Sequence, residues 1–265
     1  DVWAGTRAAL QLVKTHEVKL LHARSFVPAL IARKVKQQTG LPFINDIRGF
    51  WVDEKANKGS LSQDSVLFKC GKRLEENCYL ESDAIVSLSE AGLEEIRSWG
   101  IWDGCKQPSM VMIPTCVDLN VYQPRQRLDT KTPVFGYVGS LGRGYLGLEL
   151  FRFFKRATMV FPGSRLLVVS RTDRELLQQW LVDADVDGDQ VEMVSADPGE
   201  VPGQVARMDV GLSFIEQHYA KKASCPTKLG EYLAAGIPVI TNPGIGDTDA
   251  ILINTNTGVV IEDFN

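Results

Sequence analysis

The sequence predicts an α/β protein made of two domains, each built around a doubly wound parallel β-sheet. Short runs of β-branched and apolar residues alternate with stretches of helical periodicity along almost the whole chain, as they do in repeated strand–helix–strand units. The length of 265 residues suits two cores of about 130 residues each. Prolines and polar residues interrupt the alternation near the middle of the chain, so we place a linker at residues 125–132.

The first domain is expected to span residues 1–124. Its apolar patterns predict strands over residues 17–21, 42–47, 84–88 and 110–113, and helices over residues 2–14, 26–38, 61–80 and 89–98. Ser89 directly precedes an apolar period through Leu93 and Ile96, which is a signal for the start of a helix. Strands separated by helices in this way form a parallel sheet.

The second domain is expected to span residues 133–265. Strands are predicted over residues 134–138, 165–169, 190–194, 209–213, 237–241 and 258–261, with helices over residues 148–160, from residue 172, and over residues 226–235. Sheets of this kind bind ligands at the carboxyl ends of their strands. We therefore expect the functional residues in a cleft where the two sheets meet.

The composition excludes several classes of protein. Hydrophobic residues make up 44% of the chain, charged residues make up 23%, and no run of 18 apolar residues occurs, so a membrane span is not expected. A net charge of -4, with acidic and basic residues interspersed, gives no basic face for nucleic acid. The five cysteines are odd in number and lack a C-x-x-C pair, which indicates reduced thiols and a cytoplasmic location; they are Cys70, Cys78, Cys105, Cys116 and Cys225.

One predicted helix carries a candidate anion site. Pro226 begins it and Gly236 ends it. Lys228 lies in its first turn, where the helix dipole disfavours a cation, so a bound diphosphate would relieve the conflict. Thr227 and Glu231 lie on the same edge of the helix as Lys228. The simpler alternative is an exposed lysine–glutamate pair on an ordinary surface helix.

The same segment carries a resemblance. Glu231-Tyr-Leu-Ala-Ala-Gly-Ile-Pro-Val-Ile240 resembles the donor-binding element of the family 4 retaining glycosyltransferases, where a glutamate and seven further residues precede Glu-Ala-Met-Ala and Gly-x-Pro-Val-Val. The resemblance implies that Glu231 binds the ribose hydroxyls of the donor. The first glutamate of the family pattern falls at Ala223, so its contact with the donor sugar is lost or comes from another group. Lys228 and the turn from Ser224 to Thr227 are the candidates, and this departure leaves retention or inversion of configuration open.

Four more segments, in order along the chain, resemble landmarks of the acceptor domain in that family. They are residues 21–25, 40–46, 82–89 and 111–118. The resemblance implies the GT-B fold, with two Rossmann-like domains and the acceptor on residues 1–124. We also expect that the opening β-α units and the closing helices of the family are missing, which makes the N-terminal domain incomplete and could leave the chain inactive.

Two clusters in the first domain are candidates for the acceptor side of the site. His22 and Arg24 end one predicted strand, and Asp46, Arg48 and Gly49 end the next. Because strand ends open into the expected cleft, we assign catalytic roles to His22, Asp46 and Arg48 and acceptor-side roles to Arg24 and Gly49. A histidine that is only a satisfied core or surface residue is the alternative for His22.

A glycine loop follows the first strand of the second domain. Gly139 and Ser140 stand where a backbone can approach a phosphate closely. In the family that the chain resembles, this loop contacts donor phosphate and sugar, with an arginine and a lysine supplying charge. Arg143 or Arg171 is the candidate arginine, and Lys228 is the candidate lysine.

Two other motif matches are set aside. Gly142, Gly144 and Gly147 fit the dinucleotide fingerprint by spacing, but they begin four residues after the strand, and Arg171 follows the next strand where an acidic ribose ligand belongs. The aspartates of residues 183–187 match the start of a calcium loop that lacks its closing glutamate. We expect neither a bound cofactor nor a metal.

The function expected from these features is hexosyl transfer from a UDP- or GDP-sugar to a hydroxyl acceptor, in glycan or polysaccharide synthesis. The acceptor could be a glycan, a lipid-linked sugar or a small metabolite, and the resemblance leaves open a peripheral association with the inner face of the membrane. Two alternatives remain: a sugar-nucleotide epimerase of the same fold, and a non-catalytic protein that binds nucleotide sugars.

Overall fold

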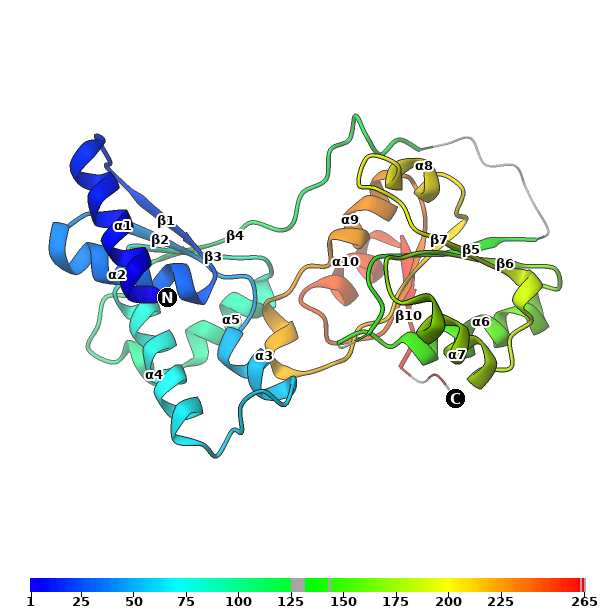
Figure 1. Ribbon diagram of the computed structural model, residues 1–265, viewed down its shortest axis with the longest axis horizontal. Helices are drawn as coiled ribbons and strands as arrows, with labels where there is room; N and C mark the ends of the chain where they lie inside the picture. The colour runs from blue at the N-terminus through cyan, green and yellow to red at the C-terminus, as the bar shows by residue number, and fades with distance from the viewer. Residues whose placement is uncertain (125–131, 143, 263, 265) are drawn as a thin grey trace. The chain divides into compact units, whose positions relative to one another are not determined.

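The computed structural model describes residues 1–124, 132–142, 144–262 and 264. The chain forms two compact units, each around its own parallel sheet (Figure 1). The first unit comprises Asp1–Pro114 and His218–Cys225, and the second comprises Thr115–Gln217 and Pro226–Asn265. The predicted α/β class with two Rossmann-like units is confirmed. The predicted linker lies outside the described residues except for Thr132, so its role stays a prediction.

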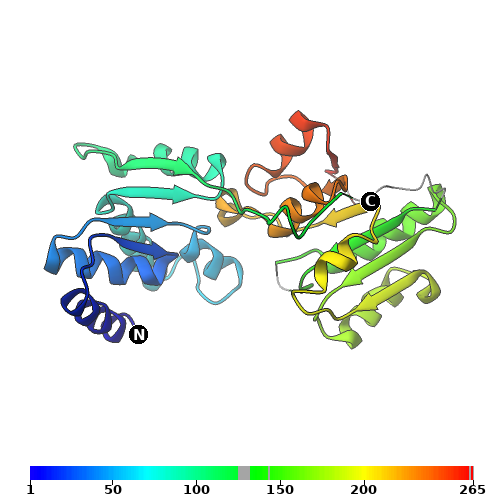
Figure 2. The ribbon, with the colours of Figure 1, turned by 90° about the horizontal axis from the view of Figure 1, so that it is seen from above.

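The sheet of the first unit has four parallel strands in the order β1-β2-β3-β4, and their arrows run the same way in Figure 2. The strands are β1 Leu21–Arg24, β2 Phe43–Asp46, β3 Ala84–Ser87 and β4 Ser109–Met112. The helices are α1 Val2–Thr15, α2 Phe26–Thr39, α3 Trp51–Asn57, α4 Val66–Leu80, α5 Glu90–Ser98 and the 3₁₀ turn η1 Gly100–Trp102. Each pair of neighbouring strands is joined through at least one helix, which is the arrangement that the alternating sequence predicts.

Side-chain caps fix the starts of α1, α4 and α5, and in α1 the Asp1 carboxylate accepts from the N–H of Trp3 at 2.9 Å. The Ser89 hydroxyl accepts a hydrogen bond from the N–H of Gly92 at 3.2 Å, which confirms the predicted start of α5. The Ser65 hydroxyl accepts one from the N–H of Phe68 at 3.1 Å and begins α4. At the C-terminal end of α2, Gly40 adopts φ +73° and closes the helix, and this conformation costs glycine little.

Two predicted elements of the first unit are wrong in their bounds. The strand expected over residues 17–21 begins only at Leu21, where the register with Phe43 starts. The helix expected over residues 61–80 begins at Val66, because a turn in which the N–H of Ser65 bonds to the carbonyl of Ser62 at 3.0 Å precedes it. The short helix α3 was not predicted.

The sheet of the second unit has six parallel strands in the order β10-β9-β8-β5-β6-β7. The strands are β5 Val134–Val138, β6 Arg165–Val169, β7 Val191–Val194, β8 Val210–Ser213, β9 Val239–Thr241 and β10 Gly258–Val260. The chain builds outward from β5 through β6 to β7, and then returns to the other side of β5 with β8. The order therefore reverses between β5 and β8, and open α/β sheets bind ligands at such a reversal.

Both faces of this sheet are covered, which explains the doubly wound pattern of the sequence. The helices are α6 Gly147–Val160, α7 Arg174–Asp183, α8 Val201–Val205, α9 Thr227–Ala234 and α10 Thr248–Thr255, with the 3₁₀ turn η2 Gly188–Gln190. Along β5, Phe135 and Tyr137 enter one buried cluster with α6, whereas Val138 enters the other with Tyr232 of α9. The alternation of side chains along a strand thus separates two cores.

The residues of His218–Cys225 belong to the first unit although they come late in the chain. They contain the 3₁₀ turn η3 Tyr219–Ala223. The Tyr219 hydroxyl donates to Glu95 of α5 at 2.9 Å, and the Lys222 ammonium pairs with the same carboxylate at 2.7 Å. The Ser89 hydroxyl donates to the carbonyl of Lys222 at 2.6 Å. The chain therefore leaves the second unit after Gln217 and returns to it at Pro226.

None of the helices in the described ranges is both long enough and apolar enough to cross a bilayer.

Candidate functional site

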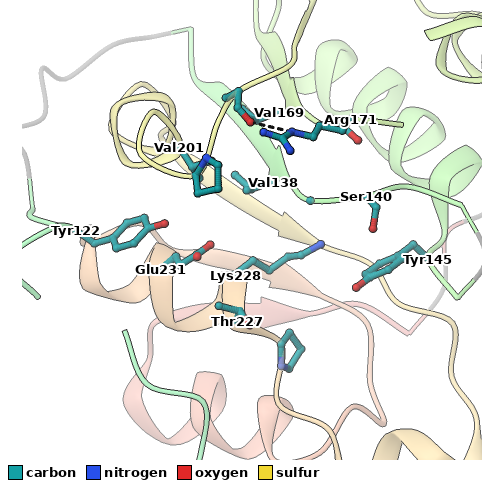
Figure 3. Close-up of a pocket in the computed structure, with 15 residues that line it drawn as sticks. Tyr122, Val138, Ser140, Tyr145, Val169, Arg171, Val201, Thr227, Lys228 and Glu231 are labelled. Atoms are coloured by element: carbon teal, nitrogen blue, oxygen red, sulfur yellow. Dashed lines mark hydrogen bonds between the residues drawn. The ribbon is translucent and has the colours of Figure 1, made fainter. Parts of the chain in front are cut away.

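A cavity of about 560 Å³ opens in the second unit beside the carboxyl ends of β5 and β6 and the start of α9 (Figure 3). We call it the α9 cavity. Its volume is in the range of small-molecule sites. It is lined by Tyr122, Val138, Gly139, Ser140, Tyr145, Val169, Ser170, Arg171, Ala196, Pro198, Val201, Pro226, Thr227, Lys228 and Glu231. The predicted donor-binding residues Gly139, Ser140, Arg171, Thr227, Lys228 and Glu231 are thus brought together.

Gly139 forms the first bend of the glycine loop. Its N–H donates to the carbonyl of Val169 at 2.9 Å, so the loop leaves the sheet beside β6. Its φ of +121° would be strained for a residue with a side chain, and a Cβ there would lie 3.4 Å from Nζ of Lys228. Glycine at this position therefore keeps open the space in which the lysine amine lies.

The rest of the loop is held by two side chains, one from the end of β5 and one from the segment that follows β6. The Tyr137 hydroxyl donates to the carbonyl of Ser140 at 2.9 Å. Thr172 holds both backbone groups of Leu141, because its hydroxyl accepts from the N–H at 2.7 Å and donates to the carbonyl at 2.9 Å. A loop held in this way can present its backbone to a ligand without first having to be ordered.

The helix α9 is fixed against the sheet by its buried face. Leu229 and Tyr232 are buried in the core beneath it. The Tyr232 hydroxyl accepts a hydrogen bond from the N–H of Val138 at 2.9 Å, which ties α9 to the end of β5. Pro226 at the N-cap offers no side-chain cap, and in this first turn the N–H of Leu229 donates to the carbonyl of Pro226 at 3.1 Å. The N–H groups of Thr227 and Lys228 lie at the start of the helix, where no intrahelical acceptor is available to them.

Lys228 is the most unusual side chain of the α9 cavity. The residue is only 7% exposed, and its Nζ atom, fully buried, has no hydrogen-bond partner among the described residues. Nζ lies 3.8 Å from the ring centroid of Tyr137 and 4.7 Å from that of Tyr145. Burial lowers the pKa of Lys228 to about 7, and the charge of Glu231 opposes this only in part.

Glu231 stands one turn along α9 from Lys228 and lines the same cavity. Its carboxylate is directed toward the hydroxyl of Tyr122 in Figure 3. Burial, together with the charge and hydrogen bonding of Glu231, raises the pKa of Tyr122 well above its ordinary value. The carboxylate therefore has one neutral donor beside it and keeps further acceptor capacity for a ligand.

Of the two predicted arginines, only Arg171 lies among the described residues. Arg171 lines the cavity, but its side chain is 60% exposed. Its guanidinium pairs with Asp197, and its Nε donates to the carbonyl of Ala196 at 3.3 Å. Arg143 lies outside the described residues. Of the two candidates, Arg171 is the one that the structure places at the site, and an exposed ion pair such as this one holds it only weakly.

Ser224, also predicted to bind donor, is not among the residues that line the α9 cavity. It belongs to the segment His218–Cys225, which packs with the first unit. The neighbouring Ala223, where the family pattern has a glutamate, is fully buried, and a Cβ on Gly92 would lie 2.7 Å from its Cβ. Position 223 is thus a packing position in this chain.

In the first unit the structure groups the three predicted catalytic residues. Asp46 is 8% exposed at the carboxyl end of β2, and its Oδ2 lies 3.3 Å from Nε2 of His22. The Arg48 guanidinium lies 3.8 Å from Oδ1 of the same carboxylate. Arg24 is an exposed neighbour whose position on β1 is in register with Asp46, and Gly49 adopts φ +139° in the loop after β2.

Across residues 1–124, 132–142, 144–262 and 264, no group of three or more histidine, cysteine, aspartate or glutamate side chains is placed to hold a metal ion. The expected independence from metal stays a prediction.

No family model matches the sequence, and no curated protein matches it. Solved structures do. Sucrose-phosphate synthase from Thermosynechococcus elongatus is similar over 98% of this chain and 65% of its own, with a TM-score of 0.73 and 17% identity. A glycosyltransferase from Rickettsia africae is similar over 100% of this chain and 68% of its own, with a TM-score of 0.71 and 14% identity. HepE from Anabaena, in complex with UDP and glucose, is similar over 91% of this chain and 63% of its own, with a TM-score of 0.66 and 13% identity.

All three are glycosyltransferases of one fold. This chain has the GT-B fold. It spans about two thirds of the length of these structures, from 63% to 68%. The α9 cavity is lined by residues of the second unit alone.

Three tyrosines at the site were not predicted from the sequence: Tyr122 and Tyr145 line the α9 cavity, and the ring centroid of Tyr137 lies 3.8 Å from Nζ of Lys228. Two of them flank the glycine loop, with Tyr137 before Gly139 and Tyr145 after Gly144. Aromatic residues on either side of a glycine loop, with a lysine at the start of a later helix, are the signal that could have found the ring contacts.

Proposed function

We propose that the chain transfers a sugar from a nucleoside-diphosphate sugar to a hydroxyl acceptor. One observation carries the proposal: Lys228 has a buried amine without a partner among the described residues, in a cavity that also holds a glycine loop and Glu231. A cationic amine, free helix N–H groups and a loop backbone are the groups that bind a diphosphate. Solved structures of HepE with UDP and with UDP-glucose support the same ligand class.

In the proposed reaction, the bond between the anomeric carbon of the sugar and the phosphate oxygen breaks, and the acceptor hydroxyl forms the new bond to that carbon. The developing negative charge falls on the diphosphate. Lys228, the N–H groups at the start of α9 and Arg171 would stabilise it, and such electrostatic stabilisation is commonly a large part of catalysis. Glu231 would bind the ribose hydroxyls as a hydrogen-bond acceptor.

His22, Asp46 and Arg48 are proposed as the catalytic group on the acceptor side. The Asp46 carboxylate lies within 3.3 Å of His22 and can orient its ring, and an oriented imidazole can accept the proton of an attacking hydroxyl. Arg24 and Gly49 are proposed as acceptor contacts. The donor is proposed to be a UDP- or GDP-hexose, and its acceptor a hydroxyl of a glycan, a lipid-linked sugar or a small metabolite.

The first test is binding. A ligand of the folded state at a hundredfold excess over its dissociation constant adds about 2.7 kcal/mol to the free energy of unfolding. We expect UDP or GDP to raise the melting temperature by the corresponding amount, and uridine without phosphates to raise it far less, because Lys228 and the helix start bind the phosphates. A melting temperature that no nucleoside diphosphate changes would overturn the proposal.

Incubation of the protein with a UDP-sugar and no acceptor separates the other functions. A transferase hydrolyses the donor slowly, an epimerase of the same fold converts it to an isomer, and a binding protein leaves it unchanged. The same incubation with added EDTA tests the expected independence from metal, because activity that EDTA removes would contradict it.

Glu231→Gln tests the ribose contact. The amide keeps the shape of the side chain, but it replaces one acceptor oxygen with a donor, so hydrogen bonds to the ribose hydroxyls weaken. We expect the affinity for UDP to fall by about tenfold, because a hydrogen bond to a charged group contributes about 1.5–3 kcal/mol. The affinity for pyrophosphate, measured by calorimetry, should change by less than about twofold. Equal losses for the two ligands would remove Glu231 from the ribose role.

A further inference from the structure

We propose that Lys228 is neutral in the empty α9 cavity and takes up a proton when a nucleoside diphosphate binds. The donor site would then couple binding to pH through one amine. This inference rests on the proposed function, since it takes the diphosphate as the ligand, but it concerns a property that diphosphate binding does not require. A lysine that is already charged in the empty site would also bind a diphosphate, but without taking up a proton.

The surroundings of the Lys228 amine do not suit an ammonium ion. Nζ of Lys228 is buried and has no hydrogen-bond partner in the part of the chain that the structure describes. An ammonium has three donors and needs acceptors or water around it. Here the amine lies between the rings of Tyr137 and Tyr145, with Gly139 beside it. Ring faces attract a cation only moderately, and they do not replace three lost hydrogen bonds to water.

Titratable and charged groups lie around the amine on the neighbouring elements. The rings of Tyr137 from β5 and Tyr145 from the loop before α6 face it, and Glu231 of α9 and Arg171 at the end of β6 line the same cavity. Burial raises the pKa of Tyr137 far above its ordinary value, so its hydroxyl is neutral near pH 7. The positive charge of Arg171 is paired with Asp197. Glu231 is the one carboxylate in this set, and its charge opposes the effect of burial on the lysine only in part.

The balance of these groups favours loss of the proton. Burial lowers the pKa of Lys228 to about 7, from its ordinary value of 10.5. At pH 8 most of the amine in the empty site is then neutral. A diphosphate adds at least two negative charges to the cavity, which favours the charged amine. The amine lone pair then takes a proton from a buffer acid, and the conjugate base of the buffer remains in solution.

A measurable consequence follows for affinity. Because binding takes up a proton, the dissociation constant rises with pH above about 7, where the empty site has lost that proton. For one such group it should rise about eightfold between pH 7.5 and pH 8.5. The terminal phosphate of UDP is fully ionised over this range, so the ligand itself does not contribute.

The experiment is calorimetric titration of the protein with UDP at pH 8, in two buffers of low and high ionisation enthalpy. The difference in observed heat gives the number of protons taken up. We expect about 0.9 of a proton for the unchanged chain. Lys155→Met is the matched control, because it removes a lysine of the same unit that pairs with Asp185 outside the cavity. It should leave the uptake unchanged.

A second measurement observes the amine directly. With lysines labelled at Cε and Nζ, the resonance of Lys228 is the one that Lys228→Met removes. It should titrate near pH 7 in the empty protein and stay in the charged form from pH 7 to pH 9 with saturating UDP. Titration near pH 10 without UDP would overturn the inference, and so would a resonance that stays neutral with UDP.

The outcomes separate the two levels of the proposal. Binding of UDP with a heat that does not depend on the buffer would overturn proton uptake and leave the proposed function standing. Absence of UDP binding would overturn both. Two results together would support the assignment to Lys228. Lys155→Met should take up a proton on binding UDP, and Lys228→Arg should bind UDP without taking one up, because a guanidinium is always charged.

Discussion

Lys228→Met is expected to weaken UDP binding by about 100-fold while the chain stays folded. Truncating one partner of a buried, hydrogen-bonded charge pair typically costs 2–5 kcal/mol, and about 2.7 kcal/mol corresponds to a factor of 100. Methionine keeps the length of the side chain and packs well against aromatic rings, so the contacts with Tyr137 and Tyr145 persist. Calorimetric titration with UDP at pH 7 measures the loss.

The control for this prediction is again Lys155→Met, which should bind UDP as the unchanged chain does. Circular dichroism and a thermal melt of Lys228→Met establish that the variant is folded. If Lys228→Met binds UDP within a factor of three of the unchanged chain, the amine is not the phosphate ligand, and the proposed function loses the observation that carries it.

The sequence could predict α9 and its charge because the signals are local. Pro226 and Gly236 mark the ends of the helix to within two residues, and Lys228 in the first turn conflicts with the helix dipole without any knowledge of the fold. Gly139 was identified in the same way, because it directly follows a predicted strand. These residues lie together because the carboxyl end of β5 and the start of α9 meet at the order reversal of the sheet.

The environment of Lys228 could not be predicted, because it depends on contacts between distant parts of the chain. Tyr137 is 91 positions before Lys228, and only the pairing of β5 with its neighbours fixes which way its ring points. Helix periodicity alone left open whether the lysine is exposed or buried. Local signals therefore predict a positive group near a phosphate site, but not a buried amine without hydrogen-bond partners among the described residues.

The path of residues 218–225 was missed for a related reason. Nothing in the local sequence of that segment distinguishes a loop of the second unit from a segment that packs on α5. The decisive contacts are those of Tyr219 and Lys222 with Glu95, more than 120 positions earlier. Ser224 was assigned to the donor site by its distance along the chain from Lys228, and chain distance does not specify which unit a residue joins.

A buried amine without hydrogen-bond partners lowers the free energy of unfolding. This effect can be measured without any ligand. The free energy of unfolding should rise between pH 7 and pH 9 by about 2 kcal/mol more in the unchanged chain than in Lys228→Met. In the folded chain the pKa of Lys228 is about 7, whereas in the unfolded chain it returns to its ordinary value of 10.5. Between these values the unfolded state holds more protons, so stability increases with pH.

The sign is opposite to that of a lysine stabilised by an ion pair, whose contribution is lost as pH rises. Below pH 7 the amine is charged in both states, the slope vanishes, and Lys228→Met should be the more stable of the two proteins because it buries no charge. Urea unfolding at pH 6, 7, 8 and 9 measures both curves. Taking the difference between the two proteins cancels the titration of other groups, such as Cys78, whose pKa burial raises to about 12. Parallel curves from pH 7 to pH 9 would mean that Lys228 keeps its proton in the folded protein, and that water or a movement of the side chain satisfies the amine.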